Sequence, residues 1–187
     1  DLPATVRLAT NASQRVTITR DGRRVVYLGA RSGGVAQIYS RSLDQLESIP
    51  VRGAEGPLGS IFLSPDGEWI AYNDGNGKFK KIRAAGGAPV TICDAPGLFG
   101  GMGFRGAAWG AGGTIVFATS VNPALMAVSD AGGIPQPLTT PAAGEIHQRP
   151  SFLPDGKTVL FNVSVAGMPD QIAAVSLDEP KPKMLLA

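Results

Sequence analysis

A short phrase of turn and strand residues occurs four times along this chain. Residues 64–72 read SPDGEWIAY and residues 153–161 read LPDGKTVLF, and each combines Asp-Gly with an alternating apolar run that ends in an aromatic residue. Related phrases occupy residues 21–27 and 111–117, although the third copy has Ala111 in place of the aspartate. The closing aromatics, spaced by 45, 45 and 44 residues, are Tyr27, Tyr72, Phe117 and Phe161. A fixed period of this size predicts a repeat architecture.

Each copy of the phrase lies within a unit of four predicted strands. A short strand precedes it, at residues 16–18, 61–63, 107–109 and 151–153. A third strand follows at residues 37–42, 79–83, 125–129 and 171–177, and a fourth apolar segment at residues 48–51, 90–93, 137–139 and 184–186. A unit of four antiparallel strands that recurs about every 40–45 residues is typical of a β-propeller, in which each unit is one blade. The chain is therefore predicted to be all-β, with four blades at residues 11–52, 58–94, 106–140 and 149–187.

The strand count predicts an incomplete ring. A strand expected at Thr5–Leu8, within residues 1–10, reads as an extra outer strand that belongs to none of the four blades. Four blades are too few for a typical closed ring of this kind, so we expect a partial or open ring with two apolar blade faces. Because soluble monomers avoid large exposed apolar patches, we expect a homo-oligomer. The simplest is a C₂ dimer that forms an eight-bladed ring or two stacked arcs.

The charge and hydropathy of the chain exclude some classes of partner. Its 17 Lys and Arg residues and 15 Asp and Glu residues give a formal net charge of +2, and they are scattered along the sequence. Nucleic-acid binding needs a basic stripe, so no nucleic-acid partner is expected. No apolar run approaches the ~20 residues that span a bilayer, so no membrane insertion is expected. The single cysteine, Cys93, cannot form an internal disulfide and leaves the compartment open.

The repeat resembles the TolB-type propeller repeat of bacteria over residues 11–187. More narrowly, GKFKKIRAAGGAPVTICDAPG (77–97) and RPSFLPDGKTVLF (149–161) are similar to the propeller that follows the catalytic domain of many bacterial eukaryotic-like serine/threonine kinases. The resemblance implies a non-catalytic sensor or interaction module and a bacterial, extracytoplasmic or periplasmic location. The Gly-rich loop, the His-Arg-Asp loop and the Asp-Phe-Gly triplet of a kinase are missing from this sequence, so kinase activity is not implied.

The expected ligand-binding surface is one face of the propeller. Loops that link successive blades share this face with the loops between second and third strands, and such loops commonly carry function. We expect the protein to bind a protein or a small ligand there. The candidate residues are Asp74, Asn76, Asp94, Phe99, Phe104, Arg105 and Arg149. Residues 94–106 form the longest linking loop, whose aromatic residues suit partner binding and suit a plug over the channel equally well.

A catalytic alternative depends on the only histidine. His147 lies in a predicted linking loop, two residues after Glu145. The two are candidates for an acid/base pair or, together with Asp94, for holding a divalent ion such as calcium or zinc. The alternative function is therefore a metal-dependent hydrolase of esters, lactones or phosphotriesters, with its site at the channel or a dimer interface. A lone histidine is more often structural, and equivalent inward carboxylates in different blades are not found, so the sequence favours recognition.

Residues 73–77, Asn-Asp-Gly-Asn-Gly, place oxygen donors at alternate positions and faintly resemble a calcium loop. The carboxylate that such a loop needs five or six residues later is not found, because Phe79 and two lysines follow instead. A polar hairpin turn is the preferred interpretation.

Overall fold

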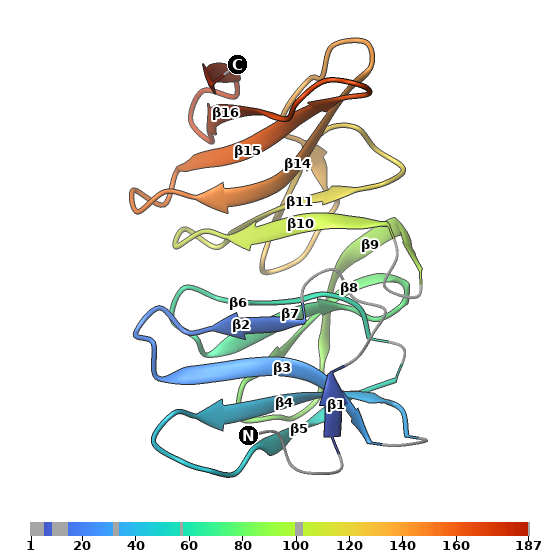
Figure 1. Ribbon diagram of the computed structural model, residues 1–187, viewed down its shortest axis with the longest axis vertical. Coiled ribbons are helices and arrows are strands. Elements are labelled where there is room, and N and C mark those ends of the chain that lie inside the picture. The colour runs from blue at the N-terminus through green and yellow to red at the C-terminus, as the bar shows by residue number, and fades with distance from the viewer. Residues whose placement is uncertain (1–5, 9–14, 32–33, 57, 100–102, 187) are drawn as a thin grey trace. The chain divides into compact units, whose positions relative to one another are not determined.

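The computed structural model describes residues 6–8, 15–31, 34–56, 58–99 and 103–186. These residues form seventeen β-strands arranged in four antiparallel sheets (Figure 1). Within them there is no helix that could cross a membrane. The chain divides into two compact units, residues 1–102 and residues 103–187. Each unit contains two sheets and a hydrophobic core of its own.

Unit 1 contains the first and second sheets. The strands of the first sheet are β1 (Val6–Leu8), β2 (Val16–Ile18), β3 (Arg24–Arg31), β4 (Ala36–Ser42) and β5 (Ile49–Glu55). The strands of the second sheet are β6 (Ile61–Leu63), β7 (Trp69–Asn73), β8 (Asn76–Arg83) and β9 (Val90–Phe99). The second sheet has the order β6-β7-β8-β9, in which each strand pairs with its neighbours in the sequence.

Unit 2 contains the third and fourth sheets. The strands of the third sheet are β10 (Phe104–Trp109), β11 (Thr114–Thr119), β12 (Met126–Ser129) and β13 (Gln136–Pro137). The strands of the fourth sheet are β14 (Glu145–Phe152), β15 (Thr158–Val165), β16 (Gln171–Ser176) and β17 (Lys183–Leu186). Both sheets follow chain order. The prediction of an all-β chain built from antiparallel blades is confirmed.

The apolar alternation of the strands places one face of each sheet in a core. In unit 1, Val26 and Leu28 of β3 pack in one cluster with Ile61, Ile70 and Tyr72 of the second sheet. In unit 2, the third and fourth sheets meet through Val116, Ala118, Leu125, Val159, Phe161 and Val163. Successive side chains of a strand point to opposite faces. The repeat aromatics of the second and fourth sheets therefore lie on the face that contacts the preceding sheet.

The Asp-Gly phrase forms the turn between the first two strands of a blade. In the second sheet, the hydroxyl of Ser64 accepts the backbone N–H five residues later at 2.9 Å, and Asp66 accepts the N–H two residues later at 3.0 Å. Gly67 follows with a φ of 72°, a left-handed conformation that glycine adopts without strain. Thr19 and Asp21 make the same two bonds in the first sheet. The phrase is therefore structural.

The predicted extra outer strand is wrong. β1 pairs with β3 through Val6 and Arg31, and β2 pairs with the same strand through Val16 and Tyr27. Both short strands thus lie along one edge of β3, because the three residues of β2 leave half of that edge without hydrogen-bond partners. β1 is the other half of the first blade's own inner strand. The remaining residues of the predicted strand segment, 1–5 and 9–10, lie outside the described part of the chain.

The strands also extend beyond the predicted blade limits at residues 52, 94, 106 and 149. β5 and β9 end later than expected, and β10 and β14 begin earlier. The reason is visible in β14, where the register shifts between Gln148 and Ser151. A bulge of this kind interrupts the alternation of apolar residues while the strand pairing continues. Residues 52–55, 94–99, 104–106 and 145–150, which were assigned to linking loops, consequently belong to strands.

Candidate functional site

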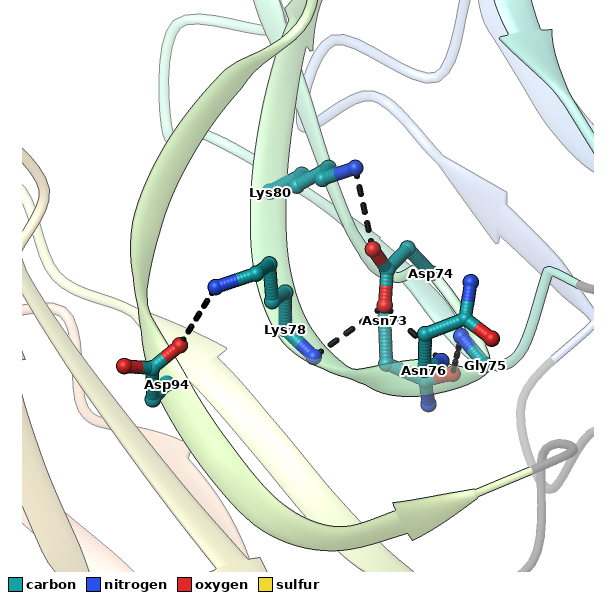
Figure 2. A network of polar contacts seen from close by, with 7 residues as sticks. All are labelled: Asn73, Asp74, Gly75, Asn76, Lys78, Lys80 and Asp94. Carbon is teal, nitrogen blue, oxygen red and sulfur yellow. Dashed lines mark hydrogen bonds and ion pairs between the residues drawn. The ribbon is translucent and has the colours of Figure 1, made fainter.

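The hairpin between β7 and β8 is held by the buried carboxylate of Asp74 (Figure 2). One oxygen, Oδ1, accepts the backbone N–H groups of Asn76 at 2.9 Å and Lys78 at 3.1 Å. The other oxygen, Oδ2, lies 2.9 Å from Nζ of Lys80. Burial alone would raise the pKa of Asp74, but the bonds from Lys80 and the two backbone amides hold it below its ordinary value. The polar hairpin interpretation is confirmed.

A second ion pair spans β8 and β9 beside this hairpin (Figure 2). Nζ of Lys78 lies 2.7 Å from Oδ1 of Asp94, and the hydrogen bond raises the pKa of the lysine. The Asp94 side chain is 79% exposed. Asp94 was predicted to lie in a linking loop, but it belongs to β9. Each carboxylate at this end of the second sheet therefore has its own lysine.

His147 and Glu145 lie on β14 and not in a loop, which corrects the prediction for both. The histidine is only 3% exposed, and its ring packs 4.8 Å from that of Phe161. Nδ1 lies 2.8 Å from the hydroxyl of Thr139, which also accepts the backbone N–H of Leu125 at 3.0 Å. Nε2 lies 3.6 Å from the Glu145 carboxylate. Burial lowers the pKa of His147, and Glu145 only partly opposes this effect.

These contacts give the histidine a structural role. Glu145 also accepts the backbone N–H of Ala142 at 2.8 Å, so its carboxylate stabilises the turn that leads into β14. The described residues contain no group of three His, Cys, Asp or Glu side chains that could hold a metal ion. Asp94, the third candidate ligand, lies in unit 1 and is paired with Lys78. Glu145 and His147 alone do not make a metal centre.

A polar network connects the third and fourth sheets within unit 2. Nη1 of Arg105 donates to Gln148 at 3.4 Å, and the Gln148 amide donates to Oγ of Ser164 at 2.7 Å. Ser164 and Asn162 then donate to the two oxygens of Asp170, at 2.6 and 3.1 Å. The Ser164 bond and then the Asn162 bond lower the pKa of this exposed carboxylate. The Asp170 carboxylate thus accepts hydrogen bonds from two uncharged donors.

Arg149 lies beside this network in an unusual conformation. Its φ of 54° makes it the one residue other than glycine with a positive φ in the described part of the chain. The guanidinium approaches Asp170 only to 4.0 Å, and the side chain is 69% exposed. Gly106 permits this geometry, because a Cβ atom there would lie 2.9 Å from Cα of Arg149. A left-handed arginine stores strain, and such strain concentrates at functional sites.

The sequence named some of these residues and missed others. Arg105 and Arg149 were candidates, and the network joins both of them to one cluster. Asp170 was missed, although Asn162 gives a signal. It is a polar residue, as is Asn73 of the second blade, at a repeat position where the first and third blades have Leu28 and Ala118.

The two aromatic candidates need correction. Phe104 was assigned to the longest linking loop, as a candidate for partner binding or for a plug over the channel, but it is buried in β10. Its burial removes it from the surface available to a partner. The side chain of Phe99 lies outside the described part of the chain, although its backbone ends β9.

Unit 1 also contains cavities that the sequence did not indicate. A cavity of about 510 Å³ lies by the Asp-Gly turns of the first and second sheets, and its lining includes Arg23, Asp44 and Glu68. A second cavity, of about 380 Å³, shares Arg24, Ser42 and Glu68 with the first. Together they form a mixed-charge surface between the first two sheets.

Comparison with known proteins identifies solved structures that share this fold. No protein-family model matches the chain, and no curated protein matches it. Among solved structures, a putative TolB from Agrobacterium tumefaciens is 19% identical, with a TM-score of 0.67 over 93% of this chain. TolB from Acinetobacter baumannii is 17% identical, with a TM-score of 0.68 over 96% of this chain. The fold is that of TolB-type β-propellers.

The likeness extends to proteins of different activity. The chain spans 61% of the Agrobacterium structure and 44% of the Acinetobacter structure. A puromycin hydrolase is 15% identical, with a TM-score of 0.66 over 92% of this chain and 28% of its own. At these identities the comparisons establish the fold and leave the function to be argued from the residues.

Proposed function

We propose that the protein is a non-catalytic recognition module that binds an acidic group of a protein or small ligand through Arg149. The observation that carries the proposal is the exposed guanidinium of this residue, held on strained backbone at the edge of a polar network. Arg105 adds a second cation to the same network. A guanidinium presents a planar fork of donors that matches a carboxylate or a phosphate.

The arrangement of the charges supports binding at unit 2 in preference to the hairpin of the second sheet. Asp74 and Asp94 each have a lysine within 2.9 Å, so those cations are already engaged. Arg149 is 4.0 Å from its carboxylate, which leaves its fork free to form closer bonds to an incoming anion. The resemblance to TolB-type propellers is the basis for a bacterial, extracytoplasmic setting.

No observation favours the hydrolase alternative. A catalytic histidine must reach the substrate or a metal-bound water, but the ring of His147 is buried and contacts Thr139, Phe161 and Glu145. The similarity to hydrolase structures is a similarity of fold. Recognition therefore remains the function that the residues support best.

The proposal can be tested by fluorescence anisotropy with a fluorescein-labelled hexaglutamate peptide. Native protein should bind the peptide, and Arg149→Ala should weaken binding at least about tenfold, since charged hydrogen bonds contribute roughly 1.5–3 kcal/mol. Arg149→Lys should recover only part of the affinity, because it keeps the charge and loses the fork.

The matched control is Arg20→Ala, which removes an exposed arginine from the turn between β2 and β3. This control should leave peptide binding unchanged. Equal losses in Arg20→Ala and Arg149→Ala would indicate attraction by net charge alone and would contradict the proposal. So would native protein that fails to bind the peptide at low salt.

A further inference from the structure

The space between the first and second sheets changes from apolar to polar toward the Asp-Gly turns. Val26 and Leu28 of β3 lie in the core of unit 1. Arg24 lies two residues before Val26 on the same strand, so its side chain points to the same face. On β4, Ser42 pairs with Arg24 and Ser40 pairs with Val26. The face that is apolar at its centre therefore ends in an arginine and two serines.

The second sheet supplies the opposite wall of this polar space. Ile70 of β7 and Ile82 of β8 belong to the same core. Glu68 lies two residues before Ile70, where the core ends. Its backbone N–H donates to Asp66 at 3.0 Å, and its carbonyl accepts the N–H of Ala84 at 2.8 Å. The backbone of Glu68 is thus held on both sides.

The cavity of about 380 Å³ lies between these two walls, and its volume is in the range of roughly 300–1,000 Å³ that is common for small-molecule sites. Arg24 and Glu68 also line the neighbouring cavity of about 510 Å³, so they mark the end where the two cavities meet. Glu47, from the turn between β4 and β5, lines only the cavity of about 380 Å³. One cation and two carboxylates are thus distributed along this cavity.

These charged groups are not paired with one another. The side chain of Arg24 is half-buried, yet within the described residues it forms no hydrogen bond or ion pair. The same is true of the carboxylates of Glu47 and Glu68. Asp21, which lines the neighbouring cavity, accepts bonds from the Thr19 hydroxyl and a backbone N–H instead. Because a partly buried charge without a partner is costly, an anionic group from a ligand would be stabilised at Arg24.

The repeat shows that the fold itself does not require this pair of charges. In unit 2, Thr114 occupies the repeat position of Arg24, and Lys157 occupies that of Glu68. Nζ of Lys157 lies 2.7 Å from the carboxylate of Asp178, so it is already engaged. The third and fourth sheets nevertheless pack through an apolar core like that of unit 1. An unpaired arginine and glutamate on facing walls are therefore particular to the first two blades.

The lining of the cavity indicates the chemistry of its ligand. One guanidinium and two carboxylates are matched by a molecule with one carboxylate and two cationic groups. The guanidinium of Arg24 presents a planar fork that suits a carboxylate. Ile49, Pro50 and Val51 of β5 add apolar surface, which suits a short aliphatic chain between the two cationic groups. A basic α-amino acid has all of these features.

We propose that the cavity between the first and second sheets binds a basic α-amino acid. The α-carboxylate of the ligand contacts Arg24, its α-ammonium contacts Glu68, and its side-chain cation contacts Glu47. The α-carboxylate and α-ammonium are neighbours in such a ligand, as Arg24 and Glu68 are at one end of the cavity. The site lies wholly in unit 1 and is independent of the acidic-ligand binding proposed for Arg149 of unit 2.

Isothermal titration calorimetry of the native protein with L-lysine at low salt tests the site directly. Three analogues each remove one charged group: L-lysinamide lacks the carboxylate, Nα-acetyl-L-lysine lacks the α-ammonium, and L-norleucine lacks the side-chain cation. Each analogue should bind at least about fivefold more weakly than lysine, the effect expected when one partly screened ion pair is lost. Because this series uses only native protein, it does not depend on the folding of any variant.

Arg24→Gln separates a specific contact from attraction by net charge. The variant makes the protein more negative, so net charge alone would strengthen the binding of cationic lysine. The proposal predicts the opposite: lysine should bind at least about fivefold more weakly, and its affinity should approach that of lysinamide. Arg52→Gln, at an exposed arginine of β5 outside the lining of the cavity, is the matched control and should bind lysine as native protein does.

Glu47→Gln assigns the second cationic group of the ligand. It should weaken the binding of lysine and bring the affinities of lysine and norleucine together, because both ligands then lack an ion pair at that end of the cavity. Native protein that gives no binding heat with millimolar lysine would overturn the proposal. So would equal affinities of native protein for lysine and norleucine, or an Arg24→Gln variant with native circular dichroism that binds lysine as tightly as native protein.

Discussion

The hairpin of the second sheet and the polar network of the fourth sheet use aspartate in opposite ways. Asp74 is buried, accepts two backbone N–H groups and contacts Lys80 at 2.9 Å. Asp170 is exposed, accepts bonds from uncharged donors and contacts Arg149 only at 4.0 Å. The Asp74 carboxylate is paired with both of the backbone N–H groups and with the ammonium group beside it. The Asp170 carboxylate leaves a guanidinium free to bind elsewhere.

This difference separates a structural cluster from a candidate binding site. Both clusters contain acids, amides and cations, so composition alone does not distinguish them. Burial and distance do, because a buried carboxylate with a close cation contributes to folding, whereas an exposed pair at long range contributes little to stability. We therefore expect mutations in the two clusters to affect different properties.

The largest expected effect is on stability at the second sheet. Asp74→Ala should lower the free energy of unfolding by about 2–3 kcal/mol, because it removes the acceptor of two backbone N–H groups and leaves the ammonium of Lys80 without its partner. Asp170→Ala, the matched variant of the fourth sheet, should cost about 1 kcal/mol or less. Urea unfolding of the native protein and both variants measures the difference.

Asp94→Ala is the internal control for this comparison. Its carboxylate pairs with Lys78 but is 79% exposed, so the loss should stay below about 0.5 kcal/mol. If Asp170→Ala destabilised the protein as much as Asp74→Ala, the network of the fourth sheet would be structural too. The distinction between the two clusters would then fail.

His147 offers an intermediate effect that is read as pH dependence. Burial lowers its pKa in the folded state below the ordinary value of 6.5, so the unfolded chain binds the proton more readily. The stabilisation from the neutral ring is complete above that value and is lost progressively as the pH falls below it. The slope should not exceed about 1.4 kcal/mol per pH unit, the limit for one proton. Urea unfolding between pH 5.5 and 8 tests this.

The chain has one histidine, which makes the assignment simple. His147→Gln should remove the dependence in this window, whatever its effect on stability at neutral pH. A slope that survived in the variant, or native stability that increased as the pH fell, would refute the buried neutral state. An accessible, readily protonated histidine would also return the metal-binding interpretation to consideration.

Much of the fold could be predicted because the same pattern of turn and strand residues occurs four times in the sequence. The spacing of Tyr27, Tyr72, Phe117 and Phe161 counts the blades, and the Asp-Gly turns mark the hairpins. The first strand was misread because β1 and β2 are separate short strands that share one partner. Sequence pattern indicates that a segment is extended, but it does not say with which edge the segment pairs.

The site was harder to predict because a β-bulge interrupts the alternating pattern by which a strand is recognised in the sequence. Arg149 and Glu145 were placed in a loop, since the register shift in β14 interrupts the alternation that identifies a strand. The left-handed φ of Arg149 has no signal in the sequence, where a glycine would be expected. The link from Asp170 to Arg105 passes through the side chains of Ser164 and Gln148, and such chains of contacts depend on packing that one sequence does not reveal.

The smallest effect separates strain from binding at Arg149 itself. Arg149→Gly should raise the free energy of unfolding by about 0.5–1 kcal/mol, because glycine adopts the left-handed conformation without the cost that a Cβ atom imposes. The same variant should lose affinity for the acidic peptide as fully as Arg149→Ala does. Arg149→Ala keeps a Cβ atom and should therefore gain no stability. Opposite changes in stability and affinity in the glycine variant would mean that the protein retains a strained arginine for binding, whereas unchanged affinity would assign the strain to the bulge and leave the guanidinium without a role.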